Sequence, residues 1–250
     1  MQKRRNLFRQ APREEGNRLS GLRNFRSNTN GQDIEILQDV SGRKEEKGEK
    51  MKVLNLYAGI GGNRKLWGGE NTITAVELNP KIAKVYKDFY PNDEVIVGDA
   101  HEYLRQHFRE FDFIWASPPC PTHSDLQMFN YHKAEKIVYP DMKLYQEIIL
   151  LRHFYSGNWV IENVKPYYKP LIAPSFELNR HFFWSNKFIL TDTKQSSFMH
   201  LKDNEKEMQK LYGFDLSKYR KDFSNVEFRQ ILRNCVIPEL AQYIFETVNN

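Results

Sequence analysis

Cysteine is scarce in this sequence, and long apolar runs and metal-binding spacings are missing from it. The 250 residues include two cysteines, Cys120 and Cys235, and no Cys-x-x-Cys pair, which argues against a disulfide framework and a cysteine-based zinc site. The seven histidines show no spacing typical of metal ligands. No apolar run approaches the roughly 20 residues that span a bilayer, so we expect neither a membrane anchor nor a secretion signal. A cytoplasmic, reducing compartment fits this composition best.

Positive charge is concentrated near the N-terminus. The net charge is +5, but residues 1–50 carry twelve Lys and Arg against eight Asp and Glu, whereas residues 51–250 carry 25 against 24. Residues 1–50 offer few large apolar side chains to bury, which predicts a disordered basic tail. Three interpretations of this tail stay open: an arm that binds nucleic-acid phosphates, a solvated leader, or upstream sequence ahead of a translation start at Met51.

Short apolar strands alternate with amphipathic helices from Met51 onward. The pattern predicts strands over 53–57, 72–76, 95–97, 113–116 and 159–161, and helices over 80–89, 100–108 and 141–154. We expect Leu144, Ile148, Leu151 and Phe154 to share one buried face of the last helix. The alternation predicts a single α/β domain over residues 51–250, with a mostly parallel twisted sheet and helices on both faces. Ligands of such sheets bind at the carboxyl ends of the strands.

A glycine-rich loop and two carboxylates follow three of the predicted strands. Residues 58–62 read Ala-Gly-Ile-Gly-Gly, and small residues there let the backbone approach a ligand at a helix N-terminus. The loop has neither the spacing of a dinucleotide fingerprint nor the lysine of a P-loop. Glu77 can bind two ribose hydroxyls and Asp99 an exocyclic amine, although Asp99 can instead cap the following helix. Together these features predict a nucleoside-bearing cofactor.

A proline-stiffened turn follows the fourth predicted strand. In Ser117-Pro118-Pro119-Cys120, two prolines restrict the backbone and fix the direction of the next side chain. Cys120 offers a nucleophilic thiolate, although a lone cysteine can also be buried and inert. His123 either tunes this thiolate or is a polar group of the loop. Glu162, in Glu162-Asn163-Val164, ends an apolar strand, a setting that favours a protonated acid able to donate to a ring nitrogen.

Taken in order, these motifs resemble those of the DNA (cytosine-5) methyltransferases. The matching segments cover about residues 52–247 and are LYAGIGG (56–62), Glu77, Gly98-Asp99-Ala100, SPPCPTHS (117–124), IENV (161–164), NRHFFWSN (179–186), LYGF (211–214) and NCVIPELAQYI (234–244). The small size and the RHFFWSN segment are similar to bacteriophage or bacterial members. The resemblance implies the Rossmann-like fold of S-adenosylmethionine-dependent methyltransferases, a DNA substrate, and the cytoplasm of a bacterial or phage-infected cell.

The resemblance also implies roles for individual residues. Cys120 would be the nucleophile, Glu162 the partner of cytosine N3, and Arg180 a clamp on the flipped base or the nearby backbone. S-adenosylmethionine would be the cofactor and S-adenosylhomocysteine its product, with Glu77 on the ribose and Asp99 on the adenine amine. The implied cofactor contacts are Tyr57, Ala58, Gly59, Ile60, Gly61, Glu77, Leu78, Asp99, Ala100, Pro119, Asn234 and Val236.

The implied reaction follows from the electronics of the cytosine ring. Addition of the Cys120 thiolate at C6, assisted by Glu162 at N3, makes C5 nucleophilic enough to attack the methyl group. Loss of the C5 proton and expulsion of Cys120 then restore aromaticity. Because C5 is stacked in duplex DNA, the base must flip out, which costs on the order of a few kcal/mol.

Two departures from the family pattern concern DNA recognition. The segment Leu178-Asn179-Arg180-His181 retains only the first of two arginines usual there. Residues 191–203, a vestigial target-recognition region, are too few for a base-reading domain. Residues 204–250 would pack back on the cofactor half. Sequence recognition would therefore come from residues 121–139, the tail, a partner chain or self-association, or specificity is low.

An enzyme that methylates cytosine C5 in DNA is thus the leading prediction. The same chemistry on RNA or single-stranded DNA is an alternative, favoured by the short recognition region and the near-neutral charge of residues 51–250. A non-catalytic regulatory homologue is a second alternative. It would have no need for Cys120, Glu162 and Asn234 together.

Overall fold

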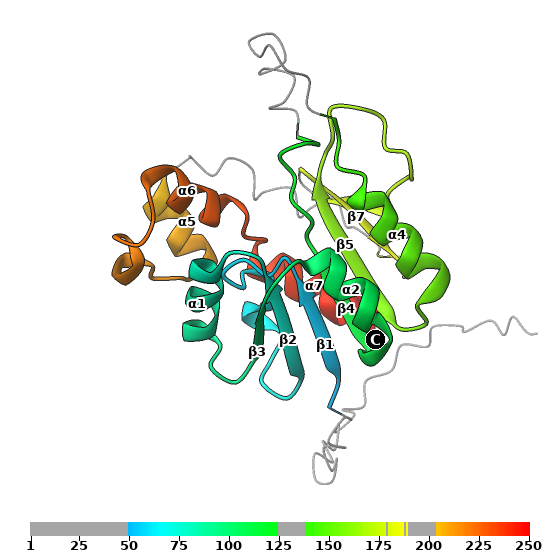
Figure 1. Cartoon of the computed structure of the whole chain (residues 1–250), viewed down its shortest axis with the longest axis horizontal. Coiled ribbons are helices and arrows are strands. Elements are labelled where there is room, and N and C mark those ends of the chain that lie inside the picture. Colours follow the sequence, from blue (N-terminus) through cyan, green and yellow to red (C-terminus); the bar gives the residue numbers. More distant parts are fainter. Residues whose placement is uncertain (1–49, 125–138, 179, 188, 190–203) are drawn as a thin grey trace, which may run out of the picture. The chain divides into compact units, whose positions relative to one another are not determined.

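The computed structural model of the chain describes residues 50–124, 139–178, 180–187, 189 and 204–250. The expectations for residues 1–49 and 191–203 fall on residues outside these ranges. The described residues form an α/β domain with helices on both faces of one sheet (Figure 1). None of the helices in these ranges combines the length and the apolar character that crossing a membrane requires.

The sheet has the strand order β3-β2-β1-β4-β5-β7-β6 within the described residues. Neighbours from β3 to β5 pair in parallel, whereas β7 pairs antiparallel with both β5 and β6. The strands are β1 (Lys52–Leu56), β2 (Thr72–Glu77), β3 (Glu94–Val97), β4 (Phe113–Ala116), β5 (Asn158–Val164), β6 (Phe176–Leu178) and β7 (His181–Ser185). The predicted mostly parallel sheet is confirmed, and its parallel strands end at one edge.

Helices follow most of the strands, as a sheet built from crossover connections requires. They are α1 (Pro80–Phe89), α2 (Ala100–His107), α4 (Lys143–Phe154), α5 (Glu205–Tyr212), α6 (Asn225–Arg233) and α7 (Pro238–Asn249), with the 3-10 turns η1 (Asn63–Leu66), η2 (Phe108–Glu110) and η4 (Ser217–Tyr219). The helix predicted over 80–89 is confirmed with both ends, because Asn79 caps it and Pro80 occupies its first turn.

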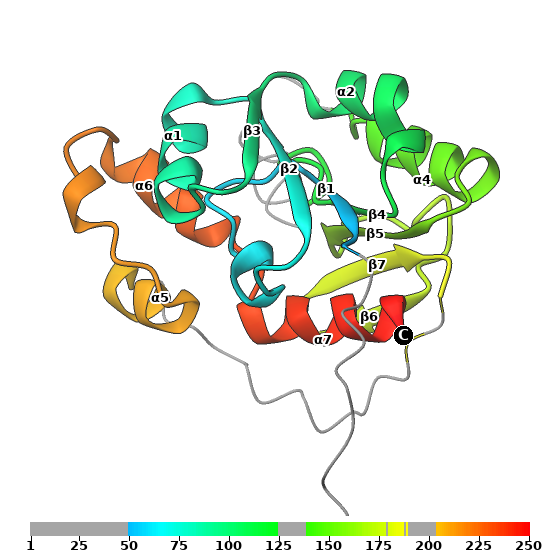
Figure 2. The same ribbon diagram turned by 90° about the horizontal axis from the view of Figure 1, so that it is seen from below.

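Alternating side chains of the strands form a core on each face of the sheet. Val53, Phe113 and Trp115 pack with α7 on one face, where Phe245 stacks on Trp67 of the loop after η1. Leu54 and Ile114 belong to the opposite core, which α2 and α4 cover. Figure 2 shows α7 on the far side of the sheet from α2 and α4. Burial on both faces explains the nearly continuous apolar sequence of these strands.

One expectation for the core is wrong. Leu144, Ile148 and Leu151 of α4 are at most 3% exposed, as predicted, but Phe154 is 61% exposed. The helix ends at Phe154, and the chain turns away there toward β5. Helical periodicity therefore does not predict the burial of a side chain at the last residue of a helix.

Helices α5 and α6 pack against α1 rather than against the sheet. Their apolar side chains join Val85 and Ile60 in a separate core. Polar contacts support this packing, since Lys81 Nζ donates to the Asp222 carbonyl at 3.1 Å and the Tyr219 hydroxyl donates to Asp88 at 2.7 Å. The segment that links α6 to α7 thereby passes beside the glycine loop after β1.

Candidate active site

The glycine loop after β1 has an unusual backbone. Tyr57 and Gly59 both have φ of +56°, and Gly61 has φ of +84°. The Ala58 N–H donates to the Val76 carbonyl at 3.0 Å, which ties the loop to β2. A left-handed conformation costs little for glycine and is strained for tyrosine. The strained residue lies at the carboxyl edge of the sheet, where ligands bind in this architecture.

Glu77 fixes this loop from the end of β2. Its Oε2 accepts a hydrogen bond from the Gly59 N–H at 3.0 Å, and its Oε1 accepts one from the Asn79 N–H at 2.9 Å. Burial raises the pKa of Glu77, and the backbone donors oppose that effect. Each carboxylate oxygen can accept a second hydrogen bond, so Glu77 retains capacity for ligand hydroxyls.

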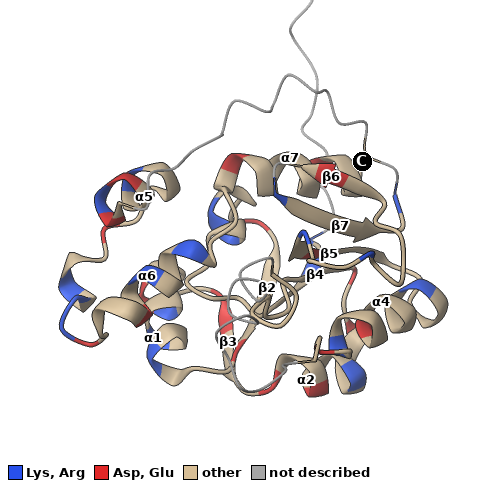
Figure 3. Ribbon diagram, turned by 90° about the horizontal axis from the view of Figure 1, so that it is seen from above, with Lys and Arg blue, Asp and Glu red and all other residues tan. Residues whose placement is uncertain are grey.

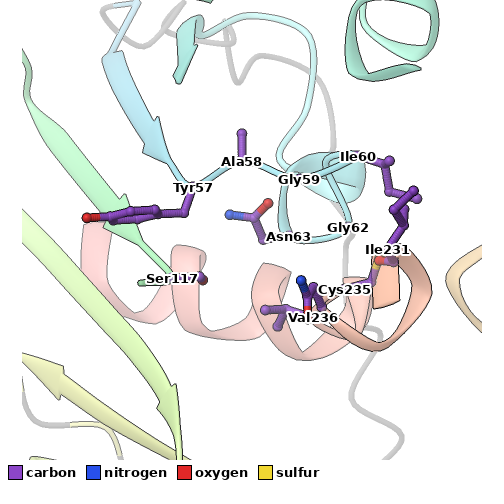
Figure 4. A pocket seen from close by; sticks show the side chains of 11 residues that line it. Tyr57, Ala58, Gly59, Ile60, Gly62, Asn63, Ser117, Ile231, Cys235 and Val236 are labelled. Carbon is purple, nitrogen blue, oxygen red and sulfur yellow. Dashed lines mark hydrogen bonds between the residues drawn. The ribbon is translucent and has the colours of Figure 1, made fainter. Parts of the chain in front are cut away.

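A pocket lies between the glycine loop and the segment before α7 (Figure 4). Gly62 allows the two to approach closely, because an added Cβ would come within 2.9 Å of the Val236 carbonyl oxygen. The lining residues are Tyr57, Ala58, Gly59, Ile60, Gly62, Asn63, Ser117, Ile231, Asn234, Cys235 and Val236. The structure thus gathers six of the twelve predicted cofactor contacts around one pocket.

The other predicted cofactor contacts lie outside that lining. Asp99 caps α2 by accepting from the His101 and Glu102 N–H groups, and its other oxygen receives Lys143 Nζ at 3.2 Å. The alternative capping role is therefore confirmed for Asp99. Leu78 is 69% exposed and Pro119 is also exposed, whereas Ala100 is buried under α2. Gly61 belongs to the glycine loop and Glu77 accepts a hydrogen bond from that loop, but neither residue lines the pocket.

The Pro-Pro-Cys turn is held by hydrogen bonds at both ends. The Asn163 side-chain amide, 2% exposed, donates to the Pro118 carbonyl at 2.9 Å. After the cysteine, the Cys120 carbonyl accepts from the His123 and Ser124 N–H groups at 2.9 and 3.0 Å. The end of β5 and this turn therefore form one rigid unit, although 43 residues separate Cys120 from Asn163 in the sequence.

Charged groups on either side act on the Cys120 thiol. Burial raises its pKa, the Glu162 carboxylate raises it further, and the Arg180 guanidinium acts in the opposite direction. The structure thus brings the three predicted catalytic residues within electrostatic range of one another. Glu162 is 6% exposed, whereas Arg180 is exposed. The other cysteine, Cys235, is partly buried, and burial raises its pKa to about 12.

His123 is a polar group of the loop. Its ring is 1% exposed, and Nδ1 lies 2.6 Å from the Tyr168 hydroxyl. Burial lowers the pKa of His123, so the ring is neutral and supplies no positive charge to a thiolate. Tuning of the thiolate by His123 is therefore not supported.

Two polar clusters at this edge escaped the sequence analysis. His181 Nδ1 is hydrogen-bonded to Glu162 Oε1 across the antiparallel β5–β7 pair. Glu147, fully buried in α4, accepts from the Tyr57 hydroxyl at 2.5 Å and lies 2.9 Å from His101 Nδ1. No local motif marks either cluster. Among the described residues, no group of three His, Cys, Asp or Glu is arranged to hold a metal ion.

The mostly parallel sheet with a pocket at the carboxyl edge of its strands is a Rossmann-like arrangement. Residues 51–170 match the family model of C-5 cytosine-specific DNA methylases. The resemblance predicted from the sequence is thereby confirmed. A comparison with curated proteins returns no match.

Solved structures are similar to parts of this chain. A SAM-dependent methyltransferase from Agrobacterium tumefaciens is 16% identical, covers 48% of this chain and 41% of its own, and has a TM-score of 0.36. A Spodoptera frugiperda DNMT2 mutant is 26% identical over 46% of this chain and 36% of its own, with a TM-score of 0.35. TrmN from Thermus thermophilus is 18% identical over 45% of this chain and 33% of its own, with a TM-score of 0.31. The matched part of the chain spans 41% or less of the length of each of these proteins.

S-adenosylmethionine is the cofactor that the family match implies, as predicted. The residues present fit this group. The space over Gly59 is open, since an added Cβ there would meet no atom within 4 Å. Glu77 keeps free acceptor capacity beside that space, and Asn234 offers an exposed amide at the pocket. A pocket with small walls and a few fixed polar groups is typical of cofactor sites.

Proposed function

We propose that this protein transfers a methyl group from S-adenosylmethionine to C5 of cytosine in DNA, with Cys120 as a covalent nucleophile. The single observation that supports this proposal most strongly is the electrostatic proximity of Cys120, Glu162 and Arg180 at one end of the sheet. The glycine-loop pocket opens at the same edge, and Ser117 of the Pro-Pro-Cys turn lines it. The proposed nucleophile Cys120, the proposed acid Glu162 and the proposed cofactor pocket therefore lie at the same end of the sheet.

The residues of this pocket would hold the cofactor by backbone and side-chain contacts. The open space over Gly59 would take the methionine part, Glu77 the ribose hydroxyls, and Asn234 with Val236 would close the pocket. The bound cofactor supplies an electrophilic methyl group. Asp99 would reach an adenine amine only with the acceptor capacity left after it caps α2 and binds Lys143.

Cys120 and Glu162 would act on opposite parts of the cytosine ring. A bond forms between Cys120 Sγ and C6 while Glu162 donates a proton to N3, which leaves electron density at C5. After C5 is methylated, its proton leaves to water, the Sγ–C6 bond breaks to release the Cys120 thiolate, and N3 returns its proton to Glu162. Glu162 must therefore carry a proton when the thiolate attacks.

The charges around Cys120 make this nucleophile dependent on substrate. In the free protein, burial and the Glu162 carboxylate raise the thiol pKa, which disfavours the thiolate. Protonation of Glu162 against a base removes the negative charge that opposes ionisation, and Arg180 then favours the thiolate. The nucleophile would thus form when a base occupies the site, which protects the cysteine at other times.

The target base must leave the DNA stack to reach Cys120, at a cost on the order of a few kcal/mol. Exposed Arg180 is the proposed clamp on the base or the adjacent backbone. Figure 3 shows Lys and Arg interspersed with Asp and Glu on α1, α5 and α6, so these helices offer mixed charge to DNA. Because counterion release scales with phosphate contacts, we expect modest duplex affinity unless a partner chain, self-association or residues 1–49 contribute.

Transfer of tritiated methyl groups tests this proposal. Purified protein is offered duplex DNA, single-stranded DNA and RNA, with Cys120→Ser as the test variant and His153→Asn, at an exposed position of α4, as the control. We expect incorporation at cytosine in DNA, full loss in Cys120→Ser and retention in His153→Asn. Full transfer by Cys120→Ser, or no transfer to any polynucleotide, would overturn the proposal. Exclusive transfer to RNA or to single strands would assign the same chemistry to the other substrate.

A further inference from the structure

The carboxyl group of Glu162 has a partner on the neighbouring strand. His181 begins β7 and its Nδ1 is hydrogen-bonded to Oε1 of Glu162 on β5. In the β5–β7 register, His181 lies opposite Val164, two residues beyond Glu162 on the same face of the strand. This diagonal placement lets an imidazole reach across the antiparallel pair to a glutamate.

The hydrogen bond to His181 connects the buried carboxyl group of Glu162 to solvent. The Glu162 side chain is 8% exposed, whereas the His181 side chain is 30% exposed. A neutral imidazole that donates from Nδ1 has an acceptor at Nε2 and can take up a second proton there. His181 therefore offers Glu162 both a fixed hydrogen bond and a route for protons.

Several charged groups surround His181 on the described part of the chain. Glu162 faces it from β5 and Arg180 precedes it on the same segment, and Cys120 lies within the field of both. Lys165 and Glu177, on the neighbouring strands, form an ion pair with each other. Burial and Arg180 lower the pKa of His181, but the carboxylate of Glu162 and its hydrogen bond outweigh them, and the net shift is upward.

We propose that His181 is a positioning residue that holds Glu162 Oε1 and carries the proton that Glu162 donates to N3 of the target base. This inference rests on the proposed methyl transfer. With one proton beyond its fully deprotonated form, the pair exists as imidazolium and carboxylate or as imidazole and carboxylic acid. The acid donates its proton from Oε2 to N3 while Oε1 keeps its hydrogen bond to Nδ1, and N3 returns that proton to Oε2 when Cys120 leaves. Between turnovers, the pair exchanges its proton with water through Nε2.

A titration of His181 tests the pair without any catalysis. In NMR spectra of the full chain, the imidazole resonance absent from His181→Asn identifies His181. We expect this ring to titrate above 6.5, the ordinary value for histidine, and to titrate lower in Glu162→Gln. A pKa of His181 at or below 6.5 in the wild type, or a pKa that is the same in Glu162→Gln as in the wild type, would overturn the inference.

The pH dependence of kcat tests the proton-carrying role. Asparagine places an amide nitrogen where histidine has Nδ1, so His181→Asn keeps the hydrogen bond to Glu162 but cannot titrate. We expect this variant to transfer methyl groups at pH 6 and to lose kcat at a lower pH than the wild type. A displacement of the alkaline limb by about one pH unit lowers kcat at pH 8 about tenfold. His181→Ala lacks both properties and should lose kcat across the whole range.

An exposed histidine of α4 supplies the matched control. His153→Asn should leave the profile unchanged, since His153 lies at the surface. Identical pH profiles for the wild type and His181→Asn would contradict the inference while leaving the methyl-transfer proposal intact. A wild type that transfers no methyl group would defeat the proposed function, and the NMR titration would still decide whether the pair exists.

Discussion

The side-chain amide of Asn163 donates a hydrogen bond to the Pro118 carbonyl at 2.9 Å, and this bond is buried. It connects the residue next to Glu162 with the turn that presents Cys120. Proline supplies no N–H in this turn. The hydrogen bond to the Pro118 carbonyl is therefore the contact through which β5 fixes the direction of the turn. The distance between Glu162, the proposed acid, and Cys120, the proposed nucleophile, therefore depends on Asn163, to which we assign no chemical step.

Asn163→Ala should loosen that turn while the domain still folds. Loss of a buried hydrogen bond that leaves the Pro118 carbonyl unpaired costs about 1–3 kcal/mol of unfolding free energy. We expect kcat to fall about tenfold or more, since a small misplacement of reacting groups is costly, with little change in cofactor binding. Urea unfolding and single-turnover methyl transfer measure the two effects. Unchanged kcat in a destabilised variant would show that the bond serves stability alone.

The reactivity of Cys120 toward iodoacetamide should report the charges around it. Because burial and Glu162 raise the thiol pKa, alkylation of the wild type should be slow at pH 7 and should rise with pH above 9. Glu162→Gln should accelerate alkylation at pH 7, and Arg180→Gln should slow it. Peptide mass spectrometry separates Cys120 from partly buried Cys235, which serves as the internal reference. Equal rates in all three proteins would refute the arrangement of charges.

Gly59→Ala separates backbone strain from cofactor contact. The left-handed backbone makes alanine costly by about 1–2 kcal/mol, but the new Cβ meets no protein atom within 4 Å. Any weakening of S-adenosylmethionine binding therefore reports a ligand in that space. Gly68→Ala is the control for strain, because its φ of +78° is also left-handed and Gly68 does not line the pocket. Calorimetric titration should show weaker binding only for Gly59→Ala, and equal affinities would place the cofactor elsewhere.

Buried Glu147 should make stability depend on pH. Burial raises its pKa against the opposing hydrogen bonds from His101 and Tyr57. Its contribution to stability is therefore fully present below the unfolded value, about 4.3, and is lost as pH rises through the higher folded value. Glu147→Gln cannot ionise, so its stability relative to the wild type should increase from pH 5 to pH 8. A difference in urea midpoints that is constant with pH would exclude this ionisation.

Local sequence was sufficient for the strands and helices that carry the site. The helix over 80–89 and the strand over 113–116 have the predicted ends, because capping residues and apolar runs are local features. The glycine loop, Asn234 and Val236 meet at one pocket as the motif order suggested. Phe154 was predicted wrongly, since a helix terminus leaves the helical face.

The polar partners of the site were not accessible to the same reasoning. The hydrogen bond between His181 and Glu162 depends on the register of an antiparallel pair, which no motif in the sequence fixes. The contact of Tyr57 with Glu147 joins residues 90 apart. Such pairs follow from tertiary packing, and a histidine or glutamate looks the same in sequence whether it is paired or not.

Covalent trapping on an oligonucleotide tests the central claim most directly. Cytosine with fluorine at C5 has no proton to lose there after methylation, so the bond from Cys120 Sγ to C6 cannot break. With S-adenosylmethionine present, we predict a stable adduct of protein and DNA that peptide mass spectrometry maps to Cys120 and that Cys120→Ser does not form. Methyl transfer to ordinary cytosine without any adduct on the fluorinated base, or an adduct at Cys235, would contradict this account.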